Sequence, residues 1–572
     1  MRKLLCVLCV FCGFQSASAL DRQAFTFTDY DLKIKVTPET QSLEAEGKVT
    51  LRNDTAQPQR NPVLQISSTL EWSSITVAGK AVQYLAQTYT SDIDHSGGLS
   101  EAIVTLPQPV PPQGTVEIEI TYSGKVPQDN MRLTRIGVPA RRAEHSDWDQ
   151  ISQSFTGVRG IGFVAWYPIA TEAASLSEGN QVFDAVRVWQ ERQSRSRMRL
   201  SFCWPGEAQL VSNGQSAAAA AANPTGLNCR ALRYDPVGME VPTFVIGPYR
   251  ALNQPPMAIQ YVVGHESHAR IWATAGEKAA PFIAQWFGPR KRPVQLVELP
   301  EKEMYPFESG SVFFTPVVGG DENDIQVVLA HQLAHASFQS PRLWMDEGLA
   351  HFAQALAREQ QEGRKAALAY MDERLPPLQE AEKEFLPAAP GKAPGPPPKG
   401  QPLVSATDEV FYRTKAMFVW WMLRDMVGDD ALERAIRAYR PEQDKEPSYF
   451  QRLLAEQFHR DLEWFFDDWV YRDRGLPDFH VTAVYPRKLL PENWSVTVTV
   501  ENAGGAGAEV PVAVQAAQGE GRKRLEVRAH EKGVVRIPIP VTPQQAVVND
   551  GSVPESDMNN NSAEIKTPET AQ

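Results

Sequence analysis

The chain has 572 residues, of which 42% are hydrophobic and 22% charged, which is typical of globular domains and excludes fibrous or largely disordered proteins. This length allows roughly three or four domains. The formal net charge of -12 argues against nucleic acid as a partner, because no basic run offsets it and phosphate contacts would need one.

The amino terminus has the residue order of a secretory signal peptide. Met-Arg-Lys precedes an apolar run from Leu4 to Phe14, and small residues follow up to Ala19. Cleavage after Ala19 is predicted, so residues 1–19 would be removed and the mature chain exported to the periplasm or the cell exterior. A membrane anchor is the alternative, but the run is shorter than the ~20 residues of a spanning helix. No later stretch predicts a membrane span.

The cysteines fit an exported protein. Three of the five lie in the predicted signal peptide, which leaves Cys203 and Cys229 in a compartment that permits disulfides. We predict a disulfide between Cys203 and Cys229, with two buried thiols as the alternative.

Residues 20–255 are predicted to form a large antiparallel β domain. Apolar and polar residues alternate with a period of two in segments such as 30–36 and 115–122, and turn residues separate these segments.

Residues 256–477 are predicted to form a mainly helical domain. Good helix formers with helical periodicity fill 274–287, 324–338, 342–371, 410–426, 430–439 and 449–471. Ser340 and Pro341 suit the N-cap and the first position of the helix that follows them. A Pro- and Gly-rich insertion at 387–400 cannot be helix or sheet.

Alternation returns after Phe479, which predicts a carboxy-terminal β-sandwich over 478–551 and a polar tail over 552–572. The chain is therefore predicted to be a multidomain α+β protein. The sequence makes no prediction about its oligomeric state.

Two histidines and a glutamate predict a metal site. His331 and His335 lie four residues apart on a predicted helix, about 400° of turn, so both rings project from one face. Glu347, at the start of the next helix, can fold back toward them. Two imidazoles and one carboxylate form a common catalytic zinc set that leaves one position for water. We predict that His331, His335 and Glu347 bind one Zn²⁺.

Gln332 occupies the position of the glutamate in the HExxH pattern of zinc peptidases. That glutamate is the general base that takes a proton from water, and an amide of the same shape has no basic oxygen. General-base assistance is worth typically ~10²- to 10⁴-fold. The pattern therefore predicts a site that binds zinc and hydrolyses weakly, unless another carboxylate replaces the base.

Three further histidines lie near this pattern or imitate it. His351 follows Glu347 by four residues, so it is a candidate accessory group that touches the metal or orients a ligand. A histidine at the helix surface is the alternative. His265 and His268 are spaced by three without the rest of the pattern and are not predicted to bind metal.

These motifs resemble the membrane alanyl aminopeptidase family, which are gluzincin zinc metallopeptidases. The resemblance extends over most of the chain and also rests on 461–470, on Gly-Leu-Pro at 475–477, on 30–51 and on 245–247. It implies a β-rich amino-terminal domain, a thermolysin-like catalytic domain, one zinc ion, and a peptide or protein substrate.

The resemblance also implies roles outside the two metal helices. Tyr412 matches the tyrosine that stabilises the tetrahedral intermediate, with a buried core tyrosine as the alternative, and Arg413 is a second candidate for the same anion. Glu308 lies where the family has a Gly-x-Met-Glu-Asn strand that grips a free amino terminus, so it is a candidate substrate-binding residue.

The chain departs from the family pattern in several places. Gln332 replaces the base, only 11 residues separate His335 from Glu347, and the Gly-x-Met-Glu-Asn strand is absent. The spacing from Tyr412 to Lys415 is one residue longer, and the helical carboxy-terminal domain of many members is missing.

Two functions follow from these patterns. One is an exported zinc metallopeptidase of the aminopeptidase type, which hydrolyses peptide bonds with zinc-activated water. The other is a zinc-binding pseudopeptidase that binds peptides or a partner without turnover. A β-domain adhesion or scaffold protein with a vestigial site is a third interpretation.

Overall fold

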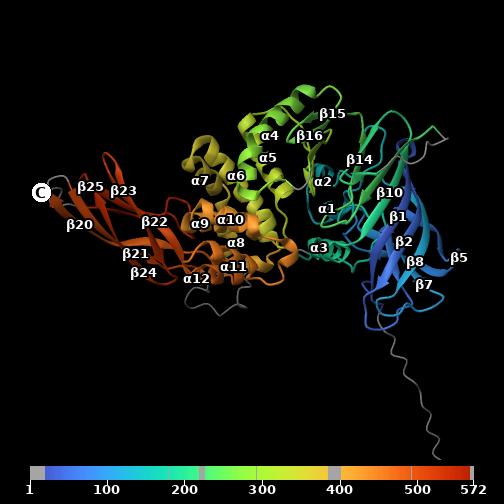
Figure 1. Cartoon of the computed structure of the whole chain (residues 1–572), viewed down its shortest axis with the longest axis horizontal. Helices are drawn as coiled ribbons and strands as arrows, with labels where there is room; N and C mark the ends of the chain where they lie inside the picture. The colour runs from blue at the N-terminus through green and yellow to red at the C-terminus, as the bar shows by residue number, and fades with distance from the viewer. Residues whose placement is uncertain are drawn as a thin grey trace, which may run out of the picture. The chain divides into compact units, whose positions relative to one another are not determined.

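The structure of the chain is a computed structural model, which describes residues 20–179, 181–217, 226–290, 293–383, 401–490 and 493–566. The chain forms two compact units (Figure 1): unit 1 is Met1–Gly206 with Gly214–Val241, and unit 2 is Glu207–Asn213 with Pro242–Gln572. The predicted signal peptide and the insertion at 387–400 lie outside the described residues. None of the described helices combines the length and apolar composition that a membrane crossing requires.

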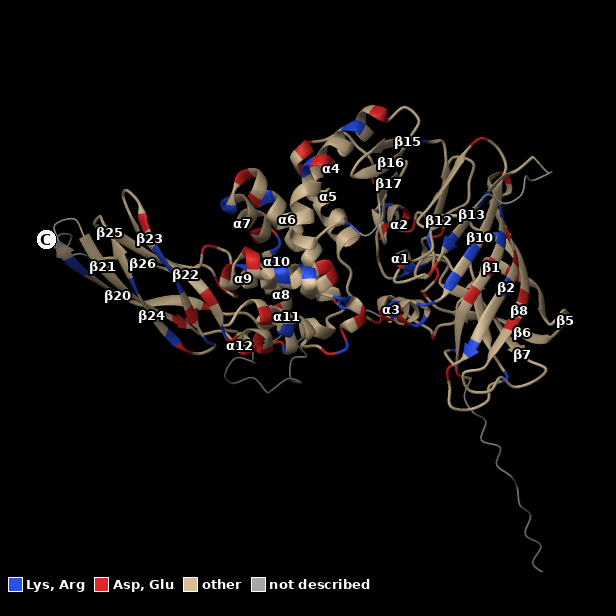
Figure 2. Cartoon of the chain, viewed as in Figure 1, with Lys and Arg blue, Asp and Glu red and all other residues tan. Residues whose placement is uncertain are grey.

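Unit 1 is built on an eight-stranded sheet of order β12-β13-β10-β1-β2-β8-β4-β5. Its strands are β1 (Phe25–Thr37), β2 (Ser42–Asn53), β4 (Leu70–Val77), β5 (Lys80–Ala81), β8 (Thr115–Lys125), β10 (Arg197–Trp204), β12 (Gln215–Ser216) and β13 (Asn228–Tyr234). In β1, Leu32 and Ile34 are buried, while Lys33 pairs with Glu46 across the exposed face at 3.1 Å. Figure 2 shows how Lys, Arg, Asp and Glu line this face, as period-two alternation requires.

One pairing in this sheet differs from the expected antiparallel arrangement, because β1 and β10 run parallel. Parallel neighbours need a long crossover connection. Residues 38–196 connect β1 to β10, and the part after β8 contains α1 (Met131–Arg135), α2 (Ala140–Ser146), β9 (Thr156–Val158) and α3 (Gln181–Gln193). On the neighbouring pair β10 and β13, Cys203 and Cys229 face each other and form a disulfide with an S–S distance of 2.07 Å.

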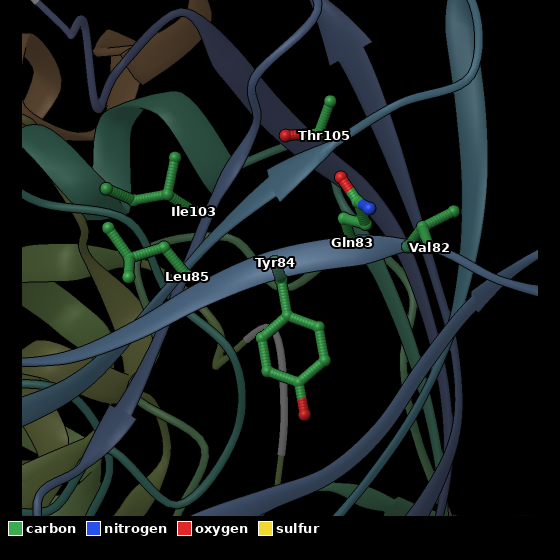
Figure 3. Close-up of a pocket in the computed structure, with 6 residues that line it drawn as sticks. All are labelled: Val82, Gln83, Tyr84, Leu85, Ile103 and Thr105. Carbon is green, nitrogen blue, oxygen red and sulfur yellow. The ribbon is translucent and has the colours of Figure 1, made fainter.

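A second sheet of unit 1, with order β3-β7-β6, carries a hollow. Its strands are β3 (Val63–Ser67), β6 (Gln83–Thr90) and β7 (Gly98–Thr105). The hollow is lined by Val82, Gln83, Tyr84, Leu85, Ile103 and Thr105 (Figure 3). This lining has no carboxylate, imidazole or thiol, so it lacks the groups that acid–base or metal chemistry requires.

Unit 2 begins with two small sheets. β11 (Gln209–Ser212) pairs with β14 (Phe244–Gly247) in antiparallel fashion. A five-stranded sheet has the order β15-β16-β17-β19-β18, with β15 (Tyr249–Gln254), β16 (Met257–Val262), β17 (Val294–Glu298), β18 (Phe307–Ser309) and β19 (Val312–Thr315). β16, β17 and β19 are parallel neighbours, whereas β18 runs antiparallel to β19 at the edge. α4 (Glu266–Phe287) connects β16 to β17.

A helical layer follows, in which α4, α5 and α6 lie side by side (Figure 1). Its helices are α5 (Glu322–Ser337), α6 (Leu343–Glu362), α7 (Arg364–Asp372), α8 (Leu375–Lys383), the π-helix η3 (Val410–Lys415), α9 (Ala416–Val427), α10 (Asp429–Ala438), α11 (Tyr449–Gln457), α12 (Glu463–Phe466) and the π-helix η5 (Asp467–Tyr471). Short 3-10 helices occur at Pro38–Thr40 in unit 1 and at Leu403–Ser405 and Pro441–Gln443 in unit 2.

Several helix boundaries differ from the prediction. The segment expected as one helix over 342–371 breaks at Gly363, whose φ of 84° leaves the helical region. The segment expected over 449–471 breaks after α11, where Phe458 adopts an extended conformation. α6 begins at Leu343 with Arg342 as its N-cap, so Ser340 and Pro341 lie before the helix instead of starting it.

The carboxy-terminal part of unit 2 contains two antiparallel sheets, β20-β21-β24 and β23-β22-β25-β26. Their strands are β20 (Phe479–Leu490), β21 (Asn493–Asn502), β22 (Ala508–Ala516), β23 (Glu520–Val527), β24 (Lys532–Ile539), β25 (Pro543–Val548) and β26 (Ser562–Glu564). β26 lies in the segment expected to be a polar tail. The backbone N–H of Phe479 donates to the buried carboxylate of Glu555 at 2.7 Å, which ties this segment to β20. The chain is thus a multidomain α+β protein, as predicted.

Candidate metal centre

The two histidines of α5 meet on one face of the helix. Asp321 caps α5 by accepting a hydrogen bond from the backbone N–H of Asn323 at 2.8 Å. Leu333 and Ala334 are buried in the core of unit 2. The Nε2 atoms of His331 and His335 lie 3.2 Å apart, as a spacing of four residues predicts.

The turn between α5 and α6 is braced by charged groups. The Asp346 carboxylate accepts from the backbone N–H of Ser340 at 2.8 Å, and the Ser340 hydroxyl accepts from the N–H of Arg342 at 3.1 Å. The Arg342 guanidinium donates two hydrogen bonds of 2.8 Å to the Asp444 carboxylate. The short connection therefore holds the start of α6 against α5.

Glu347 reaches the histidines with one oxygen. Its Oε1 lies 3.8 Å from the Nε2 of His335, and its Oε2 accepts from the Nε of Arg413 at 3.1 Å. Burial alone would raise the pKa of Glu347, but His335 and Arg413 outweigh it and lower the pKa to about 2. Glu347 is therefore an anion at neutral pH.

Gly348, the residue after Glu347, allows α6 to approach α9 closely. A Cβ atom at Gly348 would lie 2.6 Å from the Cβ of Ala416 and 3.1 Å from the indole nitrogen of Trp420. Only glycine fits between these two helices, which fixes the distance of Glu347 from α9.

Glu308 approaches both histidines from β18. Its Oε1 lies 3.3 Å from the Nε2 of His331, and its Oε2 lies 3.5 Å from the Nε2 of His335. Glu308, His331 and His335 offer ligand atoms that all lie within 4.8 Å of one another. The structure thus brings together the two predicted histidine ligands and Glu308, which the sequence suggested as a substrate-binding residue. The predicted ligand Glu347 contacts only His335 among these residues.

Asp346 is a functional candidate that the sequence analysis did not identify. Its Oδ2 lies 3.5 Å from the Nδ1 of His335, on the side of the ring opposite Nε2. Burial would lower the pKa of His335, but Glu308 and Asp346 outweigh it and raise the pKa to about 10. A carboxylate on the outer ring nitrogen is the usual way to orient a metal-bound histidine. The position of Asp346 directly before Glu347 in the sequence was the signal that could have identified it.

Gln332 provides no base. Its side chain is 4% exposed, and its Nε2 has no hydrogen-bond partner among the described residues. An amide nitrogen does not accept a proton at neutral pH.

The remaining candidates lie on α6 and η3. The ring of His351 lies edge-on to that of His331, with centroids 5.0 Å apart, and burial with the field of His331 lowers the pKa of His351 well below its usual value. Tyr412 and Arg413 are neighbours on η3, and the Arg413 guanidinium lies 5.5 Å from the Tyr412 ring centre. Tyr412 is 7% exposed, and its burial raises the pKa of the phenol.

His265 and His268 take no part in this group. The Nδ1 of His265 lies 2.5 Å from the Oε1 of Glu298, a buried carboxylate at the end of β17.

The group fits a divalent cation. Nitrogen and carboxylate oxygen are ordinary zinc donors. A metal ion binds the imidazoles in their neutral form, so His335 would lose its proton on binding. The carboxylates of Glu308, Asp346 and Glu347 and the guanidinium of Arg413 then leave two negative charges, which Zn²⁺ would neutralise. The ions in this group are partly buried, so an unbalanced charge would be costly.

The fold matches those of solved zinc metallopeptidases. An M1 zinc metallopeptidase from Deinococcus radiodurans superposes with a TM-score of 0.50 at 18% identity, covering 80% of this chain and 95% of that one. A mutant of it bound to a Tyr-Ser-Ala substrate gives 0.50 at 17% identity, with 78% and 94% covered. A two-domain M1 zinc metallopeptidase mutant bound to L-tryptophan gives 0.50 at 19% identity, with 80% and 96% covered.

At this identity the likeness concerns the fold: a large amino-terminal β domain, a helical middle and carboxy-terminal sheets. No protein-family model matches the sequence, and no curated protein matches it either.

Proposed function

We propose that this chain is an exported zinc metallopeptidase of the aminopeptidase type that acts on peptides and turns over slowly. The observation that carries the proposal is the convergence of Glu308, His331 and His335, whose ligand atoms lie within 4.8 Å of one another, with Glu347 beside them at 3.8 Å from His335. A zinc ion held there would supply a Lewis acid that polarises a carbonyl group and acidifies water. Export rests on the signal-peptide pattern of residues 1–19.

The surrounding side chains support this chemistry. Asp346 orients His335 through its Nδ1, and Arg413 holds the outer oxygen of Glu347. The phenol of Tyr412 stays protonated, because burial raises its pKa, so it retains a proton to donate to a developing oxyanion. Each of these groups binds or orients, and none of them replaces the base that Gln332 lacks.

A zinc-binding pseudopeptidase is the second candidate. One observation favours it: the position of the general base holds a buried amide. Such a protein would hold peptides or a partner at an intact metal site and release them unchanged.

The test compares the natural protein with Gln332→Glu on aminoacyl and internally quenched peptides. Gln360→Glu, on the exposed surface of α6, is the matched control. We expect Gln332→Glu to raise kcat by ~10²- to 10⁴-fold, the control to leave it unchanged, and a chelator to abolish all turnover.

The outcomes separate the candidates. A general base usually contributes ~10²- to 10⁴-fold. If the kcat of the natural protein lay within about tenfold of that of Gln332→Glu, another base would be acting. Bound zinc without turnover in the natural protein would establish the pseudopeptidase. Absence of bound zinc after careful metallation would refute both candidates.

A further inference from the structure

Glu308 lies closer to the histidine nitrogens than the predicted ligand Glu347 does. The contacts of Glu308 are 3.3 and 3.5 Å, one to each imidazole, whereas the shortest contact of Glu347 is 3.8 Å to His335. The carboxylate of Glu308 therefore spans the two histidines.

These distances are those of atoms that share a zinc ion. Zinc binds nitrogen and oxygen at about 2.0–2.2 Å, and at tetrahedral angles such ligands lie about 3.3–3.5 Å apart. The two Nε2 atoms lie 3.2 Å apart, and the carboxylate of Glu308 approaches that of His331 with Oε1 at 3.3 Å and that of His335 with Oε2 at 3.5 Å.

The backbone holds Glu308 in this place. In β18, Glu308 pairs with Phe313 of β19, and the turn between the strands contains Gly310, with a φ of 62°. Side chains alternate along a strand, so Ser309 points away from Glu308. Ser309 is buried, and its hydroxyl accepts a hydrogen bond of 2.7 Å from the amide of Asn213. The strand is thus anchored from the face opposite the histidines.

Glu347 keeps its own place beside this group. Arg413 binds its outer oxygen and leaves Oε1 toward His335. The two imidazoles and the Glu308 carboxylate lie within 4.8 Å of one another, and Glu347 adds a second carboxylate 3.8 Å from the Nε2 of His335. The two carboxylates together match the charge of a divalent cation. Zinc sites with four protein ligands are closed, whereas sites with three keep a position for water.

We propose that Glu308 is a fourth protein ligand of the zinc ion and closes the resting site to solvent. This inference rests on the proposed metal site, but on neither of the two candidate functions. Water or a peptide would have to displace the Glu308 carboxylate before it reached the metal.

The test uses the full-length protein loaded with Zn²⁺ or Co²⁺ and the variant Glu308→Gln. Glu362→Gln, at the exposed end of α6, is the matched control. Competition with a chromophoric chelator measures zinc affinity, and circular dichroism of the metal-free variants verifies folding. We expect Glu308→Gln to weaken zinc binding at least about tenfold and the control to bind like the natural protein.

A second measurement needs no variant. The visible spectrum of bound Co²⁺ reports its coordination geometry, and azide adds to an open position. We expect azide to leave the spectrum of the natural protein unchanged and to alter that of Glu308→Gln.

Each outcome decides the inference. Natural zinc affinity in a folded Glu308→Gln variant, or an azide response in the natural protein, would overturn the role of Glu308 and leave the metal site standing. A natural protein that binds neither metal would overturn the metal site itself.

Discussion

Lys415 is the cation of a buried charge cluster, so replacing it with methionine should destabilise unit 2 strongly. Its ammonium lies 2.6 Å from Glu382 and 2.9 Å from Asp473, and the three side chains are 1%, 4% and 2% exposed, respectively. Removing one partner of a buried ion pair costs roughly 3–5 kcal/mol, because the remaining charge stays buried without compensation.

The surroundings of Glu382 indicate which end of this energy range applies. Burial raises the pKa of Glu382, Lys415 opposes this rise and Asp473 adds to it. Without Lys415, Glu382 would therefore take up a proton instead of remaining charged. We expect a loss of roughly 3 kcal/mol, at the lower end of that range, measured as the shift of the urea unfolding transition of the full chain by tryptophan fluorescence.

Lys383 offers a matched control on the same unit. It pairs with Glu380 at 2.9 Å, but the two side chains are 59% and 77% exposed. Such a pair contributes about 0–1 kcal/mol, so Lys383→Met should be nearly neutral. Adding Glu382→Gln and Asp473→Asn to Lys415→Met should restore most of the lost stability. Equal effects of Lys415→Met and Lys383→Met would refute the reasoning.

Two further predictions concern Glu555 and the disulfide. Burial raises the pKa of Glu555 from 4.5 to about 8. The protonated carboxyl therefore stabilises the folded state fully below pH 4.5. This stabilisation falls by about 1.4 kcal/mol per pH unit as the pH rises toward 8. Glu555→Gln should make stability less dependent on pH, which unfolding midpoints at pH 5 to 8 would measure. The same slope in the natural protein and the variant would contradict this prediction. Replacing Cys203 and Cys229, separated by 26 residues, with serine should cost unit 1 about 3 kcal/mol, and an unchanged melting temperature would count against this.

Local patterns predicted much of the fold and the histidine pair. A spacing of four residues fixes the relative direction of His331 and His335 whatever surrounds the helix. The β domain and the sandwich followed from alternation, and the helical domain from periodicity. Helix ends were less certain, because one residue such as Gly363 can end a helix inside a continuous periodic pattern.

The contact of Glu308 with the two histidines could not be predicted from local sequence patterns. It depends on how the edge strand β18 lies against α5, and no local pattern encodes that packing. The parallel neighbours β1 and β10 are a similar case. Lys35 pairs with Cys203, which lies 168 positions further along the chain, and no local pattern encodes such a distant pairing. The extra residue between Tyr412 and Lys415 corresponds to a feature of the structure. η3 is a π-helix, in which hydrogen bonds join residues i and i+5, so each turn holds more residues than a turn of an α-helix.

The close approach at Gly348 limits how this centre can be redesigned. Even the smallest side chain there would force α6 and α9 apart, because the Cβ of Ala416 lies 2.6 Å from the place it would occupy. Glu347 would move with its helix, and its 3.8 Å contact with His335 would change. Engineering of this protein as a catalyst should therefore leave that crossing untouched and vary β18 and η3, which carry Glu308 beside the histidines and Arg413 beside Glu347.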